Sequence, residues 1–141
     1  MARITKVKTG NPFEEKGSYS RIVVVDDWIL VSNTAGRNPE TKELPADPAG
    51  QVHQIFANLK VALAGVGASL ADVVRSRVFI PDPANVEVVM PVIAEYFRGI
   101  DPATTITATP LAHTTYHVEI ELTALRGAGD SEQERIVVPM F

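Results

Sequence analysis

The chain has 141 residues, of which 45% are apolar and 21% charged, so it can bury the core of one globular domain. Its net charge of -4 argues against a nucleic-acid surface, and its lack of cysteine excludes disulfides, thiolate nucleophiles and cysteine-based metal sites. No signal-peptide-like run opens the chain and no apolar run approaches about 20 residues, so we expect a cytoplasmic protein that does not cross a membrane.

The N-terminal part of the chain predicts strands separated by polar loops. A short strand is expected over residues 3–8, followed by a loop over residues 9–17, which is rich in turn-forming residues. Two β-rich runs, residues 20–25 and 28–32, flank a two-residue polar turn and predict a hairpin. Residues 33–44 predict a surface loop.

Two helices are predicted, and each begins at an Asp-Pro pair, at residues 47–48 and 82–83. Aspartate is a good N-cap residue, and proline fits the first helical position because its missing N–H has no partner there. Pro91 lies inside the second predicted helix and is expected to kink this helix or to divide it near Met90. Residues 73–80, between the two helices, predict a strand.

The last two predicted strands carry the clearest functional signal. Residues 104–109 are rich in β-branched side chains, and residues 116–125 alternate between apolar and polar side chains. This alternation predicts that His117, Glu119 and Glu121 share one face of the sheet. Carboxylates on a sheet face need water, a partner charge or a cavity.

The order of elements predicts an α+β fold with two helices on one face of a sheet. We expect residues 1–125 to form this domain and residues 126–141 to be a partly mobile C-terminal extension. Residues 126–135 lack any apolar side chain larger than alanine, whereas residues 136–141 are apolar. We therefore expect the end of the chain to dock on its own or on a neighbouring subunit.

Several short motifs occur in one order and spacing between residues 17 and 125. They are Tyr19-Ser20, Val31-Ser32, Asn38-Pro39-Glu40-Thr41, Asn58-Leu59-Lys60, Gly67-Ala68-Ser69-Leu70, Asp72-Val73-Val74, Pro102-Ala103 and Val118-Glu119-Ile120-Glu121. With this set of motifs, the chain resembles the Rid (YjgF) family. The resemblance implies a chorismate-mutase-like subunit with a mixed sheet, and a homotrimer with ligand clefts between neighbouring subunits.

The resemblance also implies a reaction. Rid proteins with the best-known activity hydrolyse reactive imines and enamines to keto acids and ammonia, and use no cofactor. An arginine after the Pro-Ala pair binds the substrate carboxylate, and a glutamate in the V-E-I-E-like strand positions water, which implies that Glu119 is catalytic. The arginine position holds Thr104, and Met90 stands where the family often has an asparagine. The chain thus resembles an arginine-lacking branch, since a hydroxyl cannot replace a bidentate guanidinium.

Other residues are predicted to bind the substrate in the cleft. Tyr19 stands at the position of a cleft tyrosine, and Asn33 and Thr34 fit a family position where the backbone approaches the ligand. Arg37, in the following loop, is a candidate for the missing cation. The remaining candidates are Met90, Thr104, Ile106 and His117.

Two functions stay open at this point. The first is an imine or enamine hydrolase with an altered small-molecule substrate, and the second is a trimer that binds a small molecule without turnover. A third, nucleic-acid cleavage, is disfavoured by the acidic balance and by the lack of a basic-aromatic stripe. No metal site is expected, because His113 and His117 do not lie on one helix where their spacing would bring them together.

Overall fold

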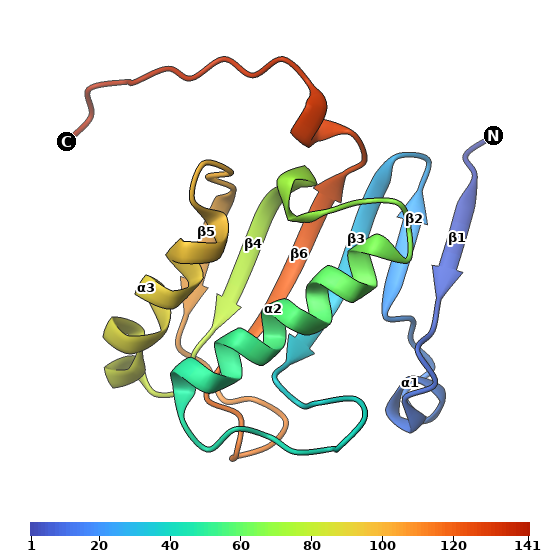
Figure 1. The fold of residues 1–141 in the computed structure, drawn as a ribbon, viewed down its shortest axis with the longest axis vertical. Helices are drawn as coiled ribbons and strands as arrows, with labels where there is room; N and C mark the ends of the chain where they lie inside the picture. The colour runs from blue at the N-terminus through green and yellow to red at the C-terminus, as the bar shows by residue number, and fades with distance from the viewer.

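A six-stranded mixed sheet forms the centre of the computed structural model, which describes residues 1–141 (Figure 1). The strands, in the order β1-β2-β3-β6-β4-β5, are β1 (Ile4–Val7), β2 (Ile22–Val25), β3 (Trp28–Ala35), β6 (Glu119–Leu125), β4 (Val73–Phe79) and β5 (Ala103–Thr107). The helices are α1 (Pro12–Lys16), α2 (Pro48–Ala64) and α3 (Val86–Phe97). Only β4 and β5 pair in parallel, and the other neighbouring strands are antiparallel.

The hairpin of β2 and β3 forms as predicted, but β3 extends beyond residues 28–32 and ends at Ala35. A bulge makes this extension possible. Ser32 and Asn33 together lie opposite Glu121 of β6, and regular pairing resumes after them. A bulge adds one residue to a strand and changes which side chain faces which side of the sheet.

The predicted loop over residues 9–17 contains the short helix α1. The Asn11 side chain caps it by accepting a hydrogen bond from the Phe13 N–H at 3.0 Å, and Pro12 occupies the first turn. The carboxylate of Glu14 is buried on its inner side. The prediction of an unbroken loop is therefore wrong over Pro12–Lys16.

Helix α2 begins at its Asp-Pro pair, as predicted, whereas the second pair begins a short turn that leads into α3. The Asp47 side chain caps α2 directly. The Asp82 side chain caps a single 3-10 turn, Pro83–Asn85, and α3 follows without a gap. The division predicted near Met90 is wrong, because α3 runs through Pro91, whose exposed ring lies on the solvent side of the helix.

The core lies between α2, α3 and one face of the sheet (Figure 1). One side of α2 is buried against the sheet, and every second residue of the central strands meets it. The buried side chains of α2 are Gln51, Val52, Ile55, Phe56, Leu59 and Leu63, and those of β3 and β6 include Ile29, Val31, Ile120, Leu122 and Ala124. Alternate residues of these strands must therefore face the other way.

The second face of the sheet is not covered by any helix of the chain (Figure 1). Large apolar side chains lie exposed on it, including Ile4, Trp28 and Leu30, with exposed fractions of 58%, 49% and 46%. An uncovered apolar sheet face marks a site of association with another molecule. No helix has the length and apolar character that a bilayer span requires.

The C-terminal segment first packs on the domain and then leaves it. Arg126 donates to the Val66 carbonyl, and the Gly129 N–H donates to the buried Asp72 carboxylate at 2.9 Å. Further on, Arg135 pairs with Asp101. Residues 136–141 are extended and exposed, and the chain ends clear of the sheet (Figure 1). The limit of the domain at residue 125 and the mobility of the extension stay predictions.

Candidate functional site

Glu119 and Asn33 form a hydrogen-bonded pair on the uncovered face of the sheet. Glu119 is the first residue of β6 and alternates with the buried Ile120, so its carboxylate lies on the side away from the helices. The Asn33 side-chain amide donates to Glu119 Oε2 at 3.1 Å. Asn33 belongs to the bulge of β3, which places its side chain beside β6. Its Oδ1 atom is buried and has no hydrogen-bond partner.

The surroundings of Glu119 favour its neutral form more than water would. Burial raises the pKa of the Glu119 carboxyl above its ordinary value, and attraction to the Arg21 guanidinium lowers it in part. A carboxylate held in this way exchanges its proton closer to neutral pH than an exposed glutamate does. This property suits a group that accepts a proton and later returns it.

Arg21 reaches this pair from the segment just before β2. Its Nη1 atom donates to the Asn33 carbonyl at 2.8 Å, and its Nε atom lies 3.3 Å from Glu14 Oε2. Glu14 also accepts hydrogen bonds from the Thr9 N–H and hydroxyl, at 2.8 and 2.7 Å. Burial alone would raise the pKa of Glu14, but the Thr9 hydrogen bonds and Arg21 outweigh it, so this pKa lies below its ordinary value.

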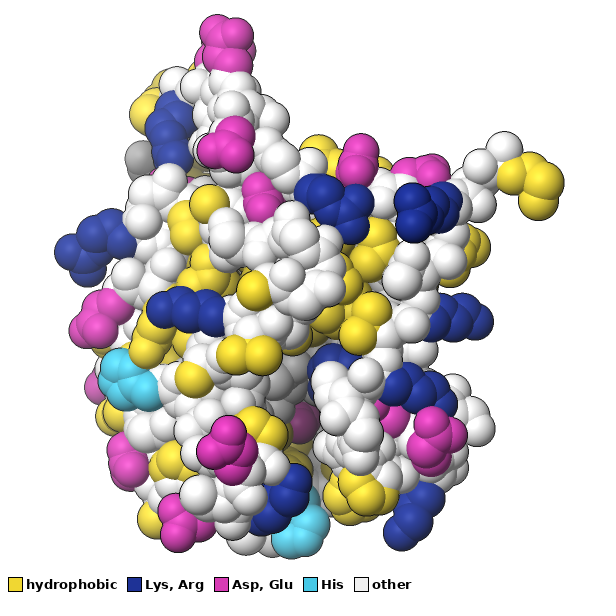
Figure 2. Space-filling model, turned by 45° about the vertical axis from the view of Figure 1, so that its right-hand side comes forward, with side chains coloured by type: hydrophobic (Ala, Val, Ile, Leu, Met, Phe, Trp, Pro, Cys, Tyr) yellow, Lys and Arg dark blue, Asp and Glu magenta, His cyan; other side chains and the backbone are white.

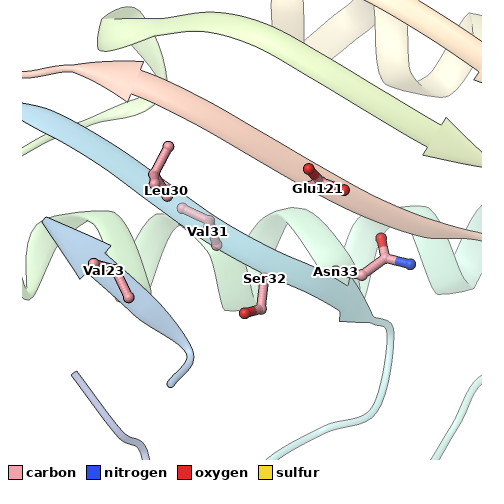
Figure 3. Close-up of a pocket in the computed structure, with 6 residues that line it drawn as sticks. All are labelled: Val23, Leu30, Val31, Ser32, Asn33 and Glu121. Atoms are coloured by element: carbon pink, nitrogen blue, oxygen red, sulfur yellow. The ribbon is translucent and has the colours of Figure 1, made fainter. Parts of the chain in front are cut away.

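A shallow pocket of about 460 Å³ adjoins the pair on the uncovered face (Figure 3). It is lined by Val23, Leu30, Val31, Ser32, Asn33 and Glu121. Figure 3 shows Asn33 and Glu121 on neighbouring strands at one end of this group, with the apolar side chains at the other. The Glu121 carboxylate lies 3.8 Å from the Arg77 guanidinium, and both side chains are more than a third exposed. Glu121 is thus paired at the surface, unlike Glu119.

Thr104 and Ile106 lie on the opposite face of the sheet from Glu119. The Thr104 hydroxyl is 2.7 Å from the Ser76 hydroxyl, and Ser76 is fully buried on the helix side of β4. Ile106 pairs with Val78, which is also buried on that side. Both residues are nevertheless exposed, because β5 is the last strand of the sheet. Within one chain they do not meet Glu119.

Arg37 is engaged in its own loop. Its Nη1 atom donates to the Lys42 carbonyl at 2.7 Å, and its guanidinium carbon lies 5.9 Å from the centre of the Tyr116 ring. No hydrogen bond or ion pair connects Arg37 with Glu119. The cation that acts on Glu119 is Arg21 instead.

His117 does not belong to a strand. Its backbone N–H donates to the Gln51 side chain at 2.8 Å, and its Nε2 atom lies 3.0 Å from the Ala46 carbonyl. The prediction that β6 starts at Tyr116 is therefore wrong, because a buried side chain of α2 takes the backbone hydrogen bond of His117. Regular pairing begins only at Glu119.

The remaining predicted residues lie around the pair at varying depth. Thr34 is 6% exposed, and its hydroxyl donates to the Ser32 carbonyl, so it is a buried part of β3. Met90 packs against the core from α3. The exposed ring of Tyr19 lies 5.8 Å from the Arg21 guanidinium carbon, so Tyr19 contacts the cation that acts on Glu119.

Three residues that hold the site in place were not predicted from the sequence. They are Glu14 and Arg21, which form a chain of contacts to Asn33, and Gln51, which accepts a hydrogen bond from the His117 N–H. Arg21 lies in the predicted strand of residues 20–25 and shares a face with Val23 and Val25, but nothing in the sequence relates this face to the face of Glu119. The burial of Glu14 has no sequence signal either, because it depends on a helix of only five residues. No group of three or more histidine, aspartate or glutamate side chains is placed to hold a metal ion.

A known protein family matches most of this chain. The family model described as Endoribonuclease L-PSP matches residues 9–126. The chain belongs to this family, which is also known as the YjgF or Rid family. The α+β fold with a mixed sheet, predicted from the motifs, is confirmed.

Individual relatives agree with this assignment over most of their length. An uncharacterised protein of Streptomyces coelicolor is 28% identical over 129 residues, covering 91% of this chain and 96% of the relative. A Rattus norvegicus protein named 2-iminobutanoate/2-iminopropanoate deaminase is 30% identical over 112 residues, covering 79% and 82%. The crystal structure of Rv2704, a YjgF/YER057c/UK114 family member from Mycobacterium tuberculosis, superposes with a TM-score of 0.79 at 33% identity, covering 87% and 99%.

Proposed function

We propose that this Rid protein hydrolyses small imines or enamines and that Glu119 is its catalytic residue. The observation that carries the proposal is the half-buried carboxylate of Glu119, which accepts a hydrogen bond from Asn33 and has a raised pKa. The similarity to proteins named 2-iminobutanoate/2-iminopropanoate deaminase supports this reaction class.

The reaction needs one group that moves a proton twice. Water adds to the carbon of the C=N bond, and Glu119 takes the proton that this water loses. Glu119 returns this proton to the nitrogen, which gives a carbinolamine. It then moves the hydroxyl proton of the carbinolamine to the nitrogen, so the C–N bond breaks and ammonia leaves as the carbonyl forms. An enamine undergoes the same steps once a proton has moved from its nitrogen to its β carbon, which makes it an imine. A carboxyl group whose pKa is raised toward working pH serves both as base and as acid.

We propose further that the cleft forms between subunits of a homotrimer. Thr104 and Ile106 lie on the other side of the sheet from Glu119, so only a second copy of the chain can bring the two sets of residues together. The exposed Trp28 and Leu30 supply an apolar face for such a contact. The homotrimer implied by the family resemblance would place such clefts between neighbouring subunits.

The substrate is expected to lack a carboxylate at the Thr104 position. A threonine hydroxyl carries no charge, and here it already bonds to Ser76. We therefore expect neutral imines or enamines to be better substrates than 2-imino acids. The same observation favours the second candidate function, a trimer that binds a small molecule without turnover.

A panel of imines and enamines, with and without a carboxylate, tests the proposal through ammonia release and carbonyl formation. We expect acceleration over the uncatalysed reaction, greatest for the neutral members. Thr104→Arg should move the preference toward 2-imino acids by about 30-fold, the effect of roughly 2 kcal/mol, and Thr105→Arg, on the other side of β5, should not. Calorimetric binding of panel members without any accelerated hydrolysis would support the binding trimer instead.

A further inference from the structure

We propose that Glu14 and Arg21 are positioning residues for Glu119. The buried Glu14 carboxylate fixes the Arg21 guanidinium, and Arg21 fixes the bulged peptide of Asn33, whose side-chain amide donates to Glu119. The inference rests on the proposed role of Glu119 and adds two residues from the segment before β2 to that role. Neither Glu14 nor Arg21 touches the reacting atoms in this assignment.

Glu14 is built into the fold as a fixed anion. It is fully buried, and its two oxygens accept from the Thr9 N–H, the Thr9 hydroxyl and Arg21 Nε. A buried carboxylate stays ionised only when partners of this kind compensate its lost hydration. Its neighbour Glu15, on the same short helix, is 75% exposed and pairs with Lys8 at the surface. The two glutamates form a matched pair for experiment.

Arg21 transmits this fixed position to the bulge. Its side chain is only 14% exposed, and it divides its donors between Glu14 on one side and the Asn33 carbonyl, 2.8 Å away, on the other. A planar guanidinium holds two acceptors in one fixed geometry, which the single ammonium group of lysine does not. Arg21→Lys therefore keeps the charge and removes the fork.

The bulge is the point at which this geometry reaches Glu119. Ser32 and Asn33 oppose one residue of β6, so the regular ladder does not by itself determine the Asn33 peptide. With its carbonyl held by Arg21, Asn33 directs its side-chain amide to Glu119 Oε2 at 3.1 Å. Successive contacts thus link Glu14 to Arg21, Arg21 to Asn33, and Asn33 to Glu119.

Because charged groups surround Glu119, its pKa can test the positioning role without an activity assay. Arg21 faces it from the segment before β2, and Glu14 lies behind Arg21 from α1. The other charged groups of the strands on this face are Glu121 on β6, Arg75 and Arg77 on β4 and Lys6 on β1, and Glu121 and Arg77 pair with each other. Loss of the Arg21 charge should raise the pKa of Glu119, since an opposite charge favours the ionised carboxylate.

The experiment is a carboxyl NMR titration of Glu119 in the full-length protein, with its signal assigned by Glu119→Gln. We expect a higher Glu119 pKa in Arg21→Gln, a shifted Asn33 side-chain amide resonance in both Arg21→Gln and Arg21→Lys, and neither change in Glu15→Gln. If Arg21→Gln does not fold, the double variant Glu14→Gln/Arg21→Gln, which buries no unpaired charge, should show the same two changes. An unchanged Glu119 pKa and Asn33 resonance in a folded Arg21 variant would overturn the inference.

Kinetics add a second readout where a substrate is found. Arg21→Lys should lower kcat on the order of 10²-fold with little change in KM, because misplacing a catalytic group affects the chemical step more than binding. Equal kcat values for wild type and Arg21→Lys would contradict the positioning role. If the protein showed no turnover, only the proposed function would be contradicted. The NMR titration tests the positioning role independently.

Discussion

At the scale of single residues, two glutamates withdrawn from water have pKa values shifted in opposite directions, because their hydrogen-bond partners differ. Glu14 is fully buried but surrounded by donors, and its pKa is lowered, whereas Glu119 has one amide donor and its pKa is raised. The lowered pKa marks a structural anion. The raised pKa marks a carboxyl group that the fold leaves ready for protonation, and this is the property that a catalytic role requires.

These two shifts predict opposite effects on stability as pH changes. The stabilisation linked to Glu119 is present below the ordinary glutamate pKa of about 4.3 and is lost as pH rises through its raised pKa. The stabilisation linked to Glu14 is present above the ordinary value and is lost as pH falls through its lowered pKa.

Denaturant unfolding between about pH 3 and pH 8 checks both signs. Relative to wild type, Glu119→Gln should gain free energy of unfolding as pH rises, and Glu14→Gln should lose it. At neutral pH, we expect Glu14→Gln to cost about 3 kcal/mol, because it leaves the largely buried Arg21 without its partner. If the free energy of unfolding changed with pH in the same way for wild type and both variants, the assigned pKa shifts of Glu14 and Glu119 would be wrong.

At the scale of elements, the sequence predicted most of the architecture because its signals are local. The Asp-Pro pairs mark where α2 and the turn before α3 begin, the two β-rich runs mark the hairpin of β2 and β3, and alternation marks the buried face of β6. Tertiary contacts determined what the sequence missed. The bulge at Asn33 depends on pairing with β6, and the late start of β6 depends on the buried side chain of Gln51.

The candidate site was predicted less completely than the fold for the same reason. Glu119 and Asn33 were expected near the cleft, and their hydrogen bond is visible only once the bulge brings them together. Arg37 was proposed as the cation, but the Lys42 carbonyl occupies it, and Arg21 acts on Glu119 instead. Residues that support a site from distant segments leave no local pattern in a sequence.

The contact between the end of β3 and the start of α2 gives a testable prediction at this scale. A Cβ atom on Gly36 would meet the backbone of Gln51, with its Cα only 2.9 Å away. Gly36→Ala should therefore push α2 from β3 and cost about 1–3 kcal/mol in denaturant unfolding. Gly65→Ala is the control, since Gly65 has a helical φ of -61° and open space on most sides, and it should be nearly neutral. Equal stability of both variants would contradict this packing.

At the scale of the whole molecule, the uncovered sheet face determines the expected assembly. Light scattering should report about three times the chain mass of 15.3 kDa. Leu30→Glu should break this assembly, because it places a charge in the centre of an apolar contact. Val61→Glu, an equally drastic change at a residue 76% exposed on α2, should leave it intact. A monomeric wild-type protein at micromolar concentration would contradict the proposed inter-subunit cleft.

Charge over the molecule fits a small-molecule ligand better than a nucleic acid. Acidic and basic side chains are interspersed on the face drawn in Figure 2, and the net charge is -4. Phosphate backbones are bound by continuous basic surfaces. The shallow pocket beside Asn33, with a volume of about 460 Å³, is instead of a size for a small ligand, with apolar side chains on one side and Asn33 and Glu121 on the other.

The most direct test of the account compares turnover by wild type, Glu119→Gln and Glu15→Gln on the best substrate of the imine and enamine panel. Glu119→Gln should keep the fold and lower turnover by about 10²–10⁴-fold, the range for a positioned acid-base group. Glu15→Gln changes the same kind of side chain at the surface, where Glu15 is 75% exposed and paired with Lys8, and should stay close to wild type. Equal ammonia release by wild type and Glu119→Gln would contradict the catalytic role of Glu119.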